Sequence, residues 1–339
     1  MKVLLFKGLL DRPEGWHDWR TEEVMDEIED SLESTGNETK RCIFRYPDKL
    51  EIAVKELRPD IVLSLVEYIY DEDGNVCWIP DILDSINASY VASDSEAIRT
   101  SINKNLSKVK FEEAGIRTPR FRVLKKGNIE FDYNEIDLNY PLILKPNDAG
   151  CSAGITFIES PGILPSAVNE LWKMYENLIL EEYVGGEDIR EITVCVLYNG
   201  SEKTMFPLEI LFPGGDRRKI LTDAIKNDPL TDKVKKPDLD IETMRALKDI
   251  ADIASDSVGY KDIIRVDTRM RNGEIYVIET NLFPGLGDDS YLRRAANNYG
   301  VGFDEVVNMM VHGGAIRYGI EIPASMSDMA YSARFRLKG

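Results

Sequence analysis

The sequence predicts an α/β protein that becomes α+β in its C-terminal part. Strand and helix signals alternate over the first ~90 residues, which is typical of a small parallel sheet. Antiparallel strand pairs follow, and the clearest of them reverses at Asn272-Gly273, a dipeptide common in β-hairpin turns. The full length of 339 residues is sufficient for two or three domains.

Each element of the N-terminal part follows from a local pattern. Val24, Ile28 and Leu32 recur at helical spacing, which predicts an amphipathic helix. The strands expected in this part lie over 3–6, 42–46, 61–66 and 89–91. The helices expected between them lie over 19–34, 49–57 and 79–86.

The rest of the chain mixes helices with antiparallel strands. One long helix is expected over 95–114, because Gly115 and then Pro119 follow it. The strands expected next lie over 121–124, 142–145, 155–158, 178–184, 192–197 and 205–212. The other expected segments are helices over 166–175, 241–258 and 303–318, and a polar, basic loop over 213–236. Residues 324–339 show no clear period and are expected to form a tail or a peripheral cover.

The composition excludes several classes of function. A net charge of −18 and a pI near 4.7 argue against non-specific binding to nucleic acid or to an anionic membrane. No apolar run approaches the ~20 residues that a membrane-spanning helix needs. Four scattered cysteines and two histidines argue against structural zinc and disulfides and indicate a reducing cytoplasm. The glycine-rich motifs of dinucleotide-binding and P-loop proteins are both absent from the sequence.

The hairpin around Asn272-Gly273 is expected to bring four polar side chains together, because strand side chains alternate between faces. The polar face carries Arg265, Asp267, Glu279 and Asn281. The core face carries Ile264, Val266, Met270, Tyr276 and Ile278. A two-residue turn would put Glu279 on the wrong face, so a three-residue loop over 271–273 is expected.

The polar face of this hairpin has the chemistry of a metal and oxyanion site. Asp267, Glu279 and Asn281 offer hard oxygen ligands of the kind that Mg²⁺ prefers. Arg265 beside them keeps its proton and suits a developing oxyanion or a phosphoryl group. The alternative interpretation is a solvated sheet face that carries charges of both signs.

A second region has the composition of a nucleotide site. Lys145 is followed by small residues over 149–154, whose backbone N–H groups can approach phosphate closely. The strand edge at 180–184 could present backbone groups to an adenine, and Lys104 could reach phosphate from its helix. The alternatives are a flexible turn, an ordinary core strand and a solvated lysine.

The order of these motifs resembles the ATP-grasp superfamily, and more closely the D-alanine–D-alanine ligase-like carboxylate–amine ligases. The similarity runs from about 85 to 318, and Arg-x-Asp followed by Glu-x-Asn-x-x-Pro-Gly is its most specific part. It implies an ATP-grasp fold, with a small Rossmann-like domain over 1–92. A central subdomain over 93–184 and a C-terminal subdomain over 185–339, with the metal site and the tail, would clamp ATP between them.

The resemblance also implies a role for each matching residue on the nucleotide side. The phosphates are matched by Lys104 and Lys145, and the tip of the phosphate-covering loop by Cys151 and Ser152. The adenine-binding hinge is matched by Glu181, Glu182, Tyr183 and Val184. Glu191 matches the ribose-binding acid, and an apparent insertion leaves Glu187 or Asp188 as alternatives. The ligands of two Mg²⁺ ions, or of Mn²⁺, are matched by Asp267, Glu279 and Asn281.

On the substrate side, Arg265 and the backbone N–H of Gly285 match the donors that hold the tetrahedral oxyanion. Closure of the loop that carries Ser152 would keep water off the acyl phosphate. Ser290 matches the residue that holds the second substrate's carboxylate, and Arg293 is a second anchor one helical turn away. The implied partners are a small carboxylate and an amino-acid-like amine, and the family expectation is a homodimer.

The first-substrate end departs from the family pattern. Segment 6–16 has no secure match to the family's Gly-Gly-x-Ser-x-Glu, and 66–68 stands where the family has His-Gly. Lys219 and Lys226 are candidates for the lysine under the phosphate loop. We therefore expect an ATP-dependent, ADP-forming ligase whose acyl donor is not strictly D-alanine. The alternatives are a true D-alanine–D-alanine ligase with a rebuilt first site, and a nucleotide-binding regulatory subunit without turnover.

Overall fold

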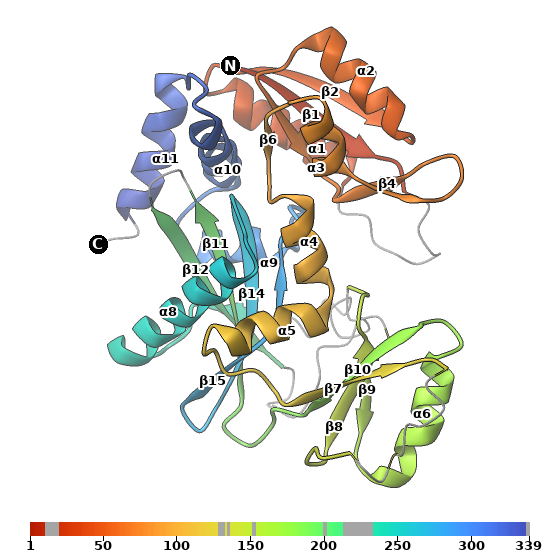
Figure 1. Cartoon of the computed structure of the whole chain (residues 1–339). Helices are drawn as coiled ribbons and strands as arrows, with labels where there is room; N and C mark the ends of the chain where they lie inside the picture. The colour runs from red at the N-terminus through yellow and green to blue at the C-terminus, as the bar shows by residue number, and fades with distance from the viewer. Residues whose placement is uncertain are drawn as a thin grey trace.

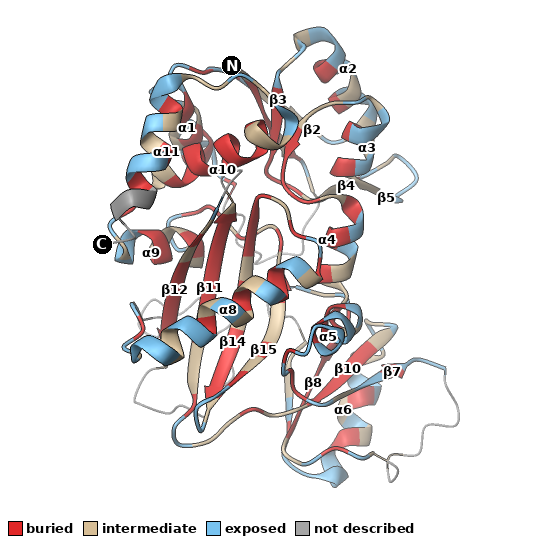
Figure 2. Ribbon diagram, turned by 60° about the vertical axis from the view of Figure 1, so that its left-hand side comes forward, coloured by how far each residue is buried: buried red, intermediate tan, exposed pale blue. Residues whose placement is uncertain are grey.

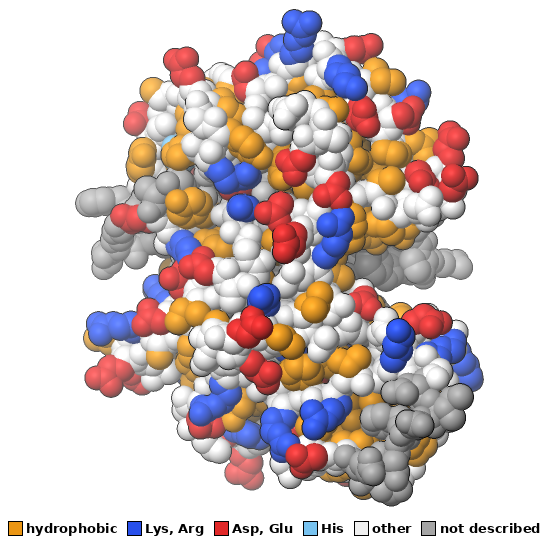
Figure 3. Space-filling view, viewed as in Figure 1, with side chains coloured by type: hydrophobic (Ala, Val, Ile, Leu, Met, Phe, Trp, Pro, Cys, Tyr) orange, Lys and Arg blue, Asp and Glu red, His pale blue; other side chains and the backbone are white. Residues whose placement is uncertain are grey.

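The computed structural model of the chain is shown in Figure 1. It describes residues 1–10, 20–127, 133, 136–150, 154–198, 202–212 and 233–336. These residues form three sheets and a two-stranded ribbon. None of the helices in these ranges combines the length and the apolar character needed to cross a bilayer. Acidic and basic side chains are scattered together over the face shown in Figure 3.

The N-terminal sheet is parallel, as the alternation of strands and helices predicts. Its strand order is β2 (Glu38–Phe44), β1 (Lys2–Gly8), β3 (Ile61–Ser64) and β6 (Tyr90–Val91). The helices of this part are α1 (Glu22–Glu33), α2 (Pro47–Leu57) and α3 (Ile79–Ser85), and the ribbon consists of β4 (Tyr68–Tyr70) and β5 (Val76–Trp78). The expected apolar face of α1, with Val24, Ile28 and Leu32, is buried.

The single helix expected over 95–114 is in fact two helices, α4 (Ser95–Ile102) and α5 (Lys104–Glu113). Asn103 lies between them with φ −80 and ψ 101, and its side chain accepts a hydrogen bond from the backbone N–H of Leu106 at 3.0 Å. An asparagine favours this N-cap over a helix interior because its side chain competes for backbone hydrogen bonds. The break places Lys104 in the first turn of a new helix.

The central sheet is antiparallel and has its own core. Its strand order is β7 (Phe121–Lys125), β10 (Asn177–Glu182), β8 (Leu142–Pro146) and β9 (Thr156–Ile158). A short 3-10 turn, η2 (Pro161–Ile163), leads into α6 (Leu164–Leu171), which packs on β8. Leucines and valines of these elements, among them Leu144, Val168 and Leu180, form a separate buried cluster.

The C-terminal sheet is also antiparallel. Its strand order is β13 (Lys233–Lys235), β12 (Lys203–Leu211), β11 (Arg190–Tyr198), β14 (Ile263–Arg271) and β15 (Glu274–Asn281). Helix α8 (Ile241–Ser257) covers one face, and α9 (Tyr291–Asn298) and α10 (Phe303–Tyr318) pack against the other side, so β11, β12 and β14 are largely buried (Figure 2). Near its end, the loop expected over 213–236 contains the edge strand β13. Its part over 213–232 lies outside the described residues.

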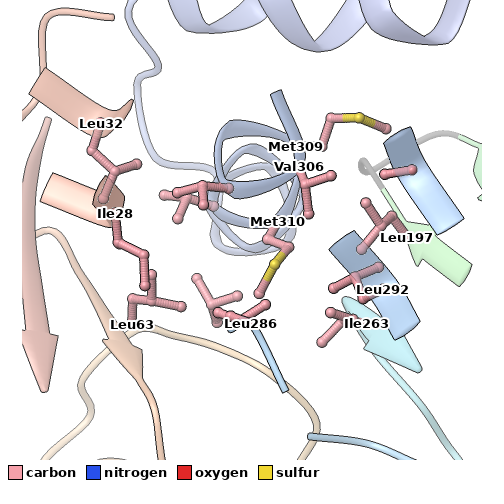
Figure 4. Close-up of a cluster of buried hydrophobic side chains, with 14 of the residues drawn as sticks. Ile28, Leu32, Leu63, Leu197, Ile263, Leu286, Leu292, Val306, Met309 and Met310 are labelled. Carbon is pink, nitrogen blue, oxygen red and sulfur yellow. The ribbon is translucent and has the colours of Figure 1, made fainter. Parts of the chain in front are cut away.

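Helix α10 joins the N-terminal and C-terminal sheets through one continuous core. Val306 and Met310 lie among side chains from both parts, including Leu63 of β3 and Ile263 of β14 (Figure 4). Gly314 allows α10 to pack closely on β6, because a Cβ at this position would lie only 3.1 Å from a methyl group of Val91.

Of the two expectations for the C-terminal segment, the peripheral cover is confirmed and the irregular tail is wrong for the described residues, because residues 324–336 form helix α11 (Ala324–Arg336) against α10. Met326, Ala330 and Ala333 are fully buried there, at helical spacing. Two of these three contacts are alanines, which contribute little to a hydrophobic period and so left the helix without a clear sequence pattern.

Candidate active site

The β14–β15 hairpin turns at Asn272-Gly273, as predicted, but with a two-residue loop rather than the expected three. Arg271 pairs with Glu274, and the two turn residues have φ of 51 and 78, as a type I′ turn requires. The register then shifts by one residue at a β-bulge between Asp267 and Thr268, which leaves Ile278 as the extra residue.

This bulge changes which side chains of β15 face the core. Ile275 and Val277 belong to the core cluster, whereas Ile278 lines a cavity beside Glu279. The expectation that Tyr276 and Ile278 face the core is therefore wrong. The expectation for Ile264, Val266 and Met270 of β14 is confirmed, because all three are buried in that cluster.

The four polar residues of the hairpin do converge. Asp267 lies opposite Glu279, and Arg265 lies opposite Asn281. Arg265 donates from Nε and Nη2 to the two carboxylate oxygens of Asp267, each at 2.8 Å. Thr193 Oγ1 and Asn281 Nδ2 donate to the same carboxylate at 2.6 and 3.1 Å. Burial alone would lower the pKa of Arg265, but Asp267 outweighs it and holds the pKa above its ordinary value.

The donor set of this cluster fits Mg²⁺. No group of three or more His, Cys, Asp or Glu side chains that could hold a metal ion occurs within the described ranges. The protein ligands of a cation at this cluster would be the carboxylates of Asp267 and Glu279 and the amide oxygen of Asn281. Mg²⁺ accepts such a site, because it keeps several ligands from water and phosphate.

The two predicted lysines lie next to this cluster. Lys104 is buried rather than solvated, and its Nζ donates to the carbonyl oxygen of Ala149 at 2.6 Å and lies 3.8 Å from Glu279 Oε2. Lys145 Nζ lies 3.1 Å from Glu181 Oε1. Burial lowers the pKa of Lys104 more than Glu279 raises it. Both lysines are thus held at the wall of the candidate nucleotide site.

A third lysine, Lys108, was missed by sequence reasoning. It is fully buried, with its Nζ 3.3 Å from Glu181 Oε1 and 2.8 Å from Thr118 Oγ1. Burial lowers the pKa of Lys108 to about 8, although Glu181 raises it. Burial would raise the pKa of Glu181, but Lys108 and Lys145 together lower it. The sequence signal was the spacing of Lys108 one helical turn after Lys104.

The predicted adenine hinge lines a cavity between the central and C-terminal sheets. Its described lining includes Lys145, Glu181, Glu182, Tyr183, Val184, Glu191, Arg265, Asp267, Ile278 and Glu279. The backbone N–H of Tyr183 donates to the carbonyl oxygen of Pro141 at 3.0 Å. The hinge is therefore tied to the central sheet while it lines the cavity.

Of the three candidate ribose acids, Glu191 is the one that lines this cavity. Its Oε2 accepts hydrogen bonds from Arg269 Nη2 and Nε at 2.6 and 3.0 Å. Glu187 lines a different cavity, on the outer side of the hinge. Asp188 instead accepts a hydrogen bond from the backbone N–H of Asn272 at 2.6 Å, so its carboxylate is engaged with the hairpin turn.

A second cavity of about 250 Å³ adjoins the first. Its described lining includes Arg20, Leu65, Glu67, Tyr68, Ile98, Ile102, Lys104, Asp148, Ala149, Gly150, Glu279, Asn281 and Phe283. The two cavities share Glu279. The N-terminal part, the loop after β8 and the end of β15 therefore meet at one space.

The candidate substrate residues are placed differently from one another. Ser290 caps α9, where its Oγ accepts a hydrogen bond from the backbone N–H of Arg293 at 3.2 Å. Gly285 lies in the segment between β15 and α9. Arg293 binds the two carboxylate oxygens of Glu27 in α1 at 2.7 and 3.1 Å, and lines neither of the two cavities as described. The expected residues Cys151, Ser152, Lys219 and Lys226 lie outside the described residues.

Comparisons with known proteins agree with this geometry. Residues 111–312 match the family model described as the D-ala D-ala ligase C-terminus. A D-alanine–D-alanine ligase of Fervidobacterium nodosum is 28% identical over 265 residues, which is 74% of this chain and 81% of that protein. An uncharacterized protein of Sinorhizobium fredii is 27% identical over 321 residues, which is 89% of this chain and 92% of that protein.

Among solved structures, the D-alanine–D-alanine ligase from Bacillus anthracis complexed with ATP superimposes with a TM-score of 0.71. The match covers 94% of this chain and 99% of that structure at 18% sequence identity. It shows that the two proteins share a fold, which is the expected ATP-grasp fold.

Proposed function

Because this chain belongs to the D-alanine–D-alanine ligase family, we propose that it joins a carboxylate to an amine through an acyl-phosphate intermediate. It is an ATP-dependent, ADP-forming carbon–nitrogen ligase. The observation that carries the proposal is the meeting of two cavities at Glu279. One cavity has the hinge and Lys145, which suit a nucleotide, and the other has Lys104 and opens toward the N-terminal part.

ATP would bind with its adenine at the hinge over 181–184, its ribose at Glu191 and its phosphates at Lys104 and Lys145. Asp267, Glu279 and Asn281 would hold two Mg²⁺ ions, or Mn²⁺, which neutralise charge on the phosphate oxygens when bound. The family resemblance assigns Cys151 and Ser152, which lie outside the described residues, to the loop that would cover the phosphates and keep water from the reaction.

The acyl donor would bind in the second cavity with its carboxylate toward Glu279. One carboxylate oxygen attacks the γ-phosphorus, the bond from that phosphorus to the bridging oxygen of ADP breaks, and an acyl phosphate forms. The amine then attacks the acyl carbon, loses a proton, and phosphate leaves. Arg265 and the backbone N–H of Gly285 would stabilise the oxyanion in this second step. Asp267 fixes the direction of the Arg265 guanidinium through two hydrogen bonds.

The second substrate is amino-acid-like in this proposal. Ser290 stands at the N-terminus of α9, where backbone N–H groups and the helix dipole favour a carboxylate. The acyl donor is not strictly D-alanine. In support of this, the N-terminal wall of the second cavity presents the buried Arg20 together with Glu67 and Tyr68, and the last two belong to the segment that stands where the family has His-Gly.

The division into domains over 1–92, 93–184 and 185–339 is part of the proposal. The strands of each of the three sheets fall within one of these ranges. We also propose a homodimer that works in the cytoplasm, where ATP is supplied, with no nucleic-acid or membrane partner.

The test is product analysis with Mg²⁺-ATP and pooled D- and L-amino acids, read by mass spectrometry. ADP with a new amide mass other than D-alanyl-D-alanine is expected. D-alanyl-D-alanine as the sole product would instead favour the alternative, a strict D-alanine–D-alanine ligase with a rebuilt first site. AMP would contradict the acyl phosphate, and nucleotide binding without any turnover would favour a regulatory subunit.

A further inference from the structure

The Glu181 carboxylate is buried between two lysines from different elements. Lys145 of β8 and Lys108 of α5 lie 3.1 and 3.3 Å from the same oxygen, Oε1. The three side chains are 4, 5 and 0% exposed for Glu181, Lys145 and Lys108 respectively. A buried carboxylate is stable as an anion only while a cation compensates it. Glu181 therefore depends on at least one of these lysines.

The two lysines differ in what they can reach. Lys145 lines the adenine-side cavity, whereas Lys108 lines neither of the two cavities as the described residues define them. Lys108 also donates to Thr118 Oγ1 at 2.8 Å, and Thr118 donates to the carbonyl oxygen of Val277 at 2.8 Å. Lys108 is therefore anchored to β15 and, among the described residues, faces neither cavity, whereas Lys145 lies at a cavity wall where it can exchange Glu181 for a ligand.

We propose that Lys108 is the resident counter-ion of Glu181, a positioning residue that keeps this carboxylate ionised and in place when Lys145 turns to a nucleotide phosphate. The inference rests on the proposed function in taking ATP as the ligand. Without Lys108, Lys145 would be held by Glu181, or Glu181 would take up a proton when Lys145 left it. Either result weakens nucleotide binding, although Lys108 never touches the nucleotide.

The experiment measures binding of Mg²⁺ with the non-hydrolysable analogue AMP-PNP by titration calorimetry. Lys108→Met is expected to raise the Kd by about tenfold or more, because it leaves a buried charge dependent on Lys145 alone. Lys108→Arg, which keeps the charge, is expected to restore most of the affinity. Lys110→Met is the matched control, because Lys110 lies on the same helix in an exposed pair with Glu113.

A second pair of variants keeps the test valid if Lys108→Met folds poorly. Glu181→Gln removes the charge that Lys108 compensates, so adding Lys108→Met to it is expected to leave the Kd unchanged within about twofold. A purely structural Lys108 would lower the affinity equally in both backgrounds, and that outcome overturns the proposal. A wild-type affinity in folded Lys108→Met overturns it as well.

The wild-type protein separates this inference from the proposed function. If the wild type does not bind AMP-PNP, the nucleotide site itself is contradicted and the inference falls with it. If the wild type binds and Lys108→Met binds equally well, the counter-ion role alone is contradicted.

Discussion

Asp267 and Glu279 lie directly opposite each other on neighbouring strands, and a β-bulge at Ile278 is what brings them into register. With a two-residue turn and no bulge, Asp267 would face Ile278 instead. The bulge therefore supplies the shift of one residue that the turn does not. Bulges frequently re-aim a side chain beside an active site, and here the side chain is the candidate metal ligand Glu279.

Asp267→Asn should abolish ADP formation. The change removes a negative charge from the metal site and one of the two acceptors that orient Arg265. We expect kcat to fall by at least about a hundredfold, which is the effect of losing one preorganised electrostatic group. A coupled assay of ADP release measures it. Glu274→Gln, at the exposed end of the same hairpin, is the control, and a near-normal rate in Asp267→Asn would contradict the assigned role.

Gly273→Ala should destabilise the fold through the backbone alone. Gly273 has φ of +78 and open space around its Cα, so an added methyl group meets no neighbour but strains the left-handed turn. The free energy of unfolding should fall by about 1 kcal/mol in urea titrations. Gly162→Ala is the matched control, because that site is equally open and has no left-handed φ. Equal effects at the two sites would argue against strain as the cause.

Arg293→Met should affect stability rather than recognition of the second substrate. The guanidinium is bound to Glu27 at 2.7 Å and lies 4.0 Å from the ring centre of Phe303, so it connects α9 to the N-terminal part. We expect a loss of about 1 kcal/mol in unfolding free energy with an unchanged KM for the amine. Ser290→Ala should raise that KM, and it should also lower the unfolding free energy by about 1 kcal/mol because it removes the N-cap of α9. A raised KM for the amine in Arg293→Met would instead support Arg293 as an anchor of the second substrate.

Glu209 should contribute to acid sensitivity. Burial would raise the pKa of Glu209, but two hydrogen bonds from Arg190, at 2.8 and 2.7 Å, lower it below the ordinary 4.5. A lowered pKa means that the stabilisation is present above pH 4.5 and is lost as the pH falls toward the pKa of the folded state. Unfolding midpoints measured from pH 7 down to pH 3 should therefore decline less steeply in Glu209→Gln. Glu56→Gln, at an exposed position of α2, should decline as the wild type does.

The sequence was sufficient to predict that the four polar residues of the hairpin converge, but not how. Asn272-Gly273 is compatible with loops of two or three residues, and a bulge depends on pairing with the neighbouring strand rather than on a local pattern. The parallel N-terminal sheet was predictable because alternating strand and helix signals are strong over several elements.

Other parts depended on contacts between distant residues. Arg293 is one helical turn from Ser290 in the sequence, yet its partner Glu27 lies more than 260 positions earlier. Lys108 looked like an ordinary helix lysine because Glu181, its counter-charge, is on another element. In both cases the side chain is held by an ion pair with a residue that is distant in the sequence. A local stretch of sequence does not show which distant residue that is.

The shared core around α10 has a consequence for amide exchange. Since α10 closes the N-terminal and C-terminal sheets at once, a substitution such as Gly314→Leu should expose the amides of β1, β3 and β11 to solvent together. The central sheet, with its own apolar cluster, should keep its protection in the same variant. Deuterium uptake would then separate the chain into two cooperative units, one that is continuous in space but split in sequence, and one that is formed by the central sheet alone.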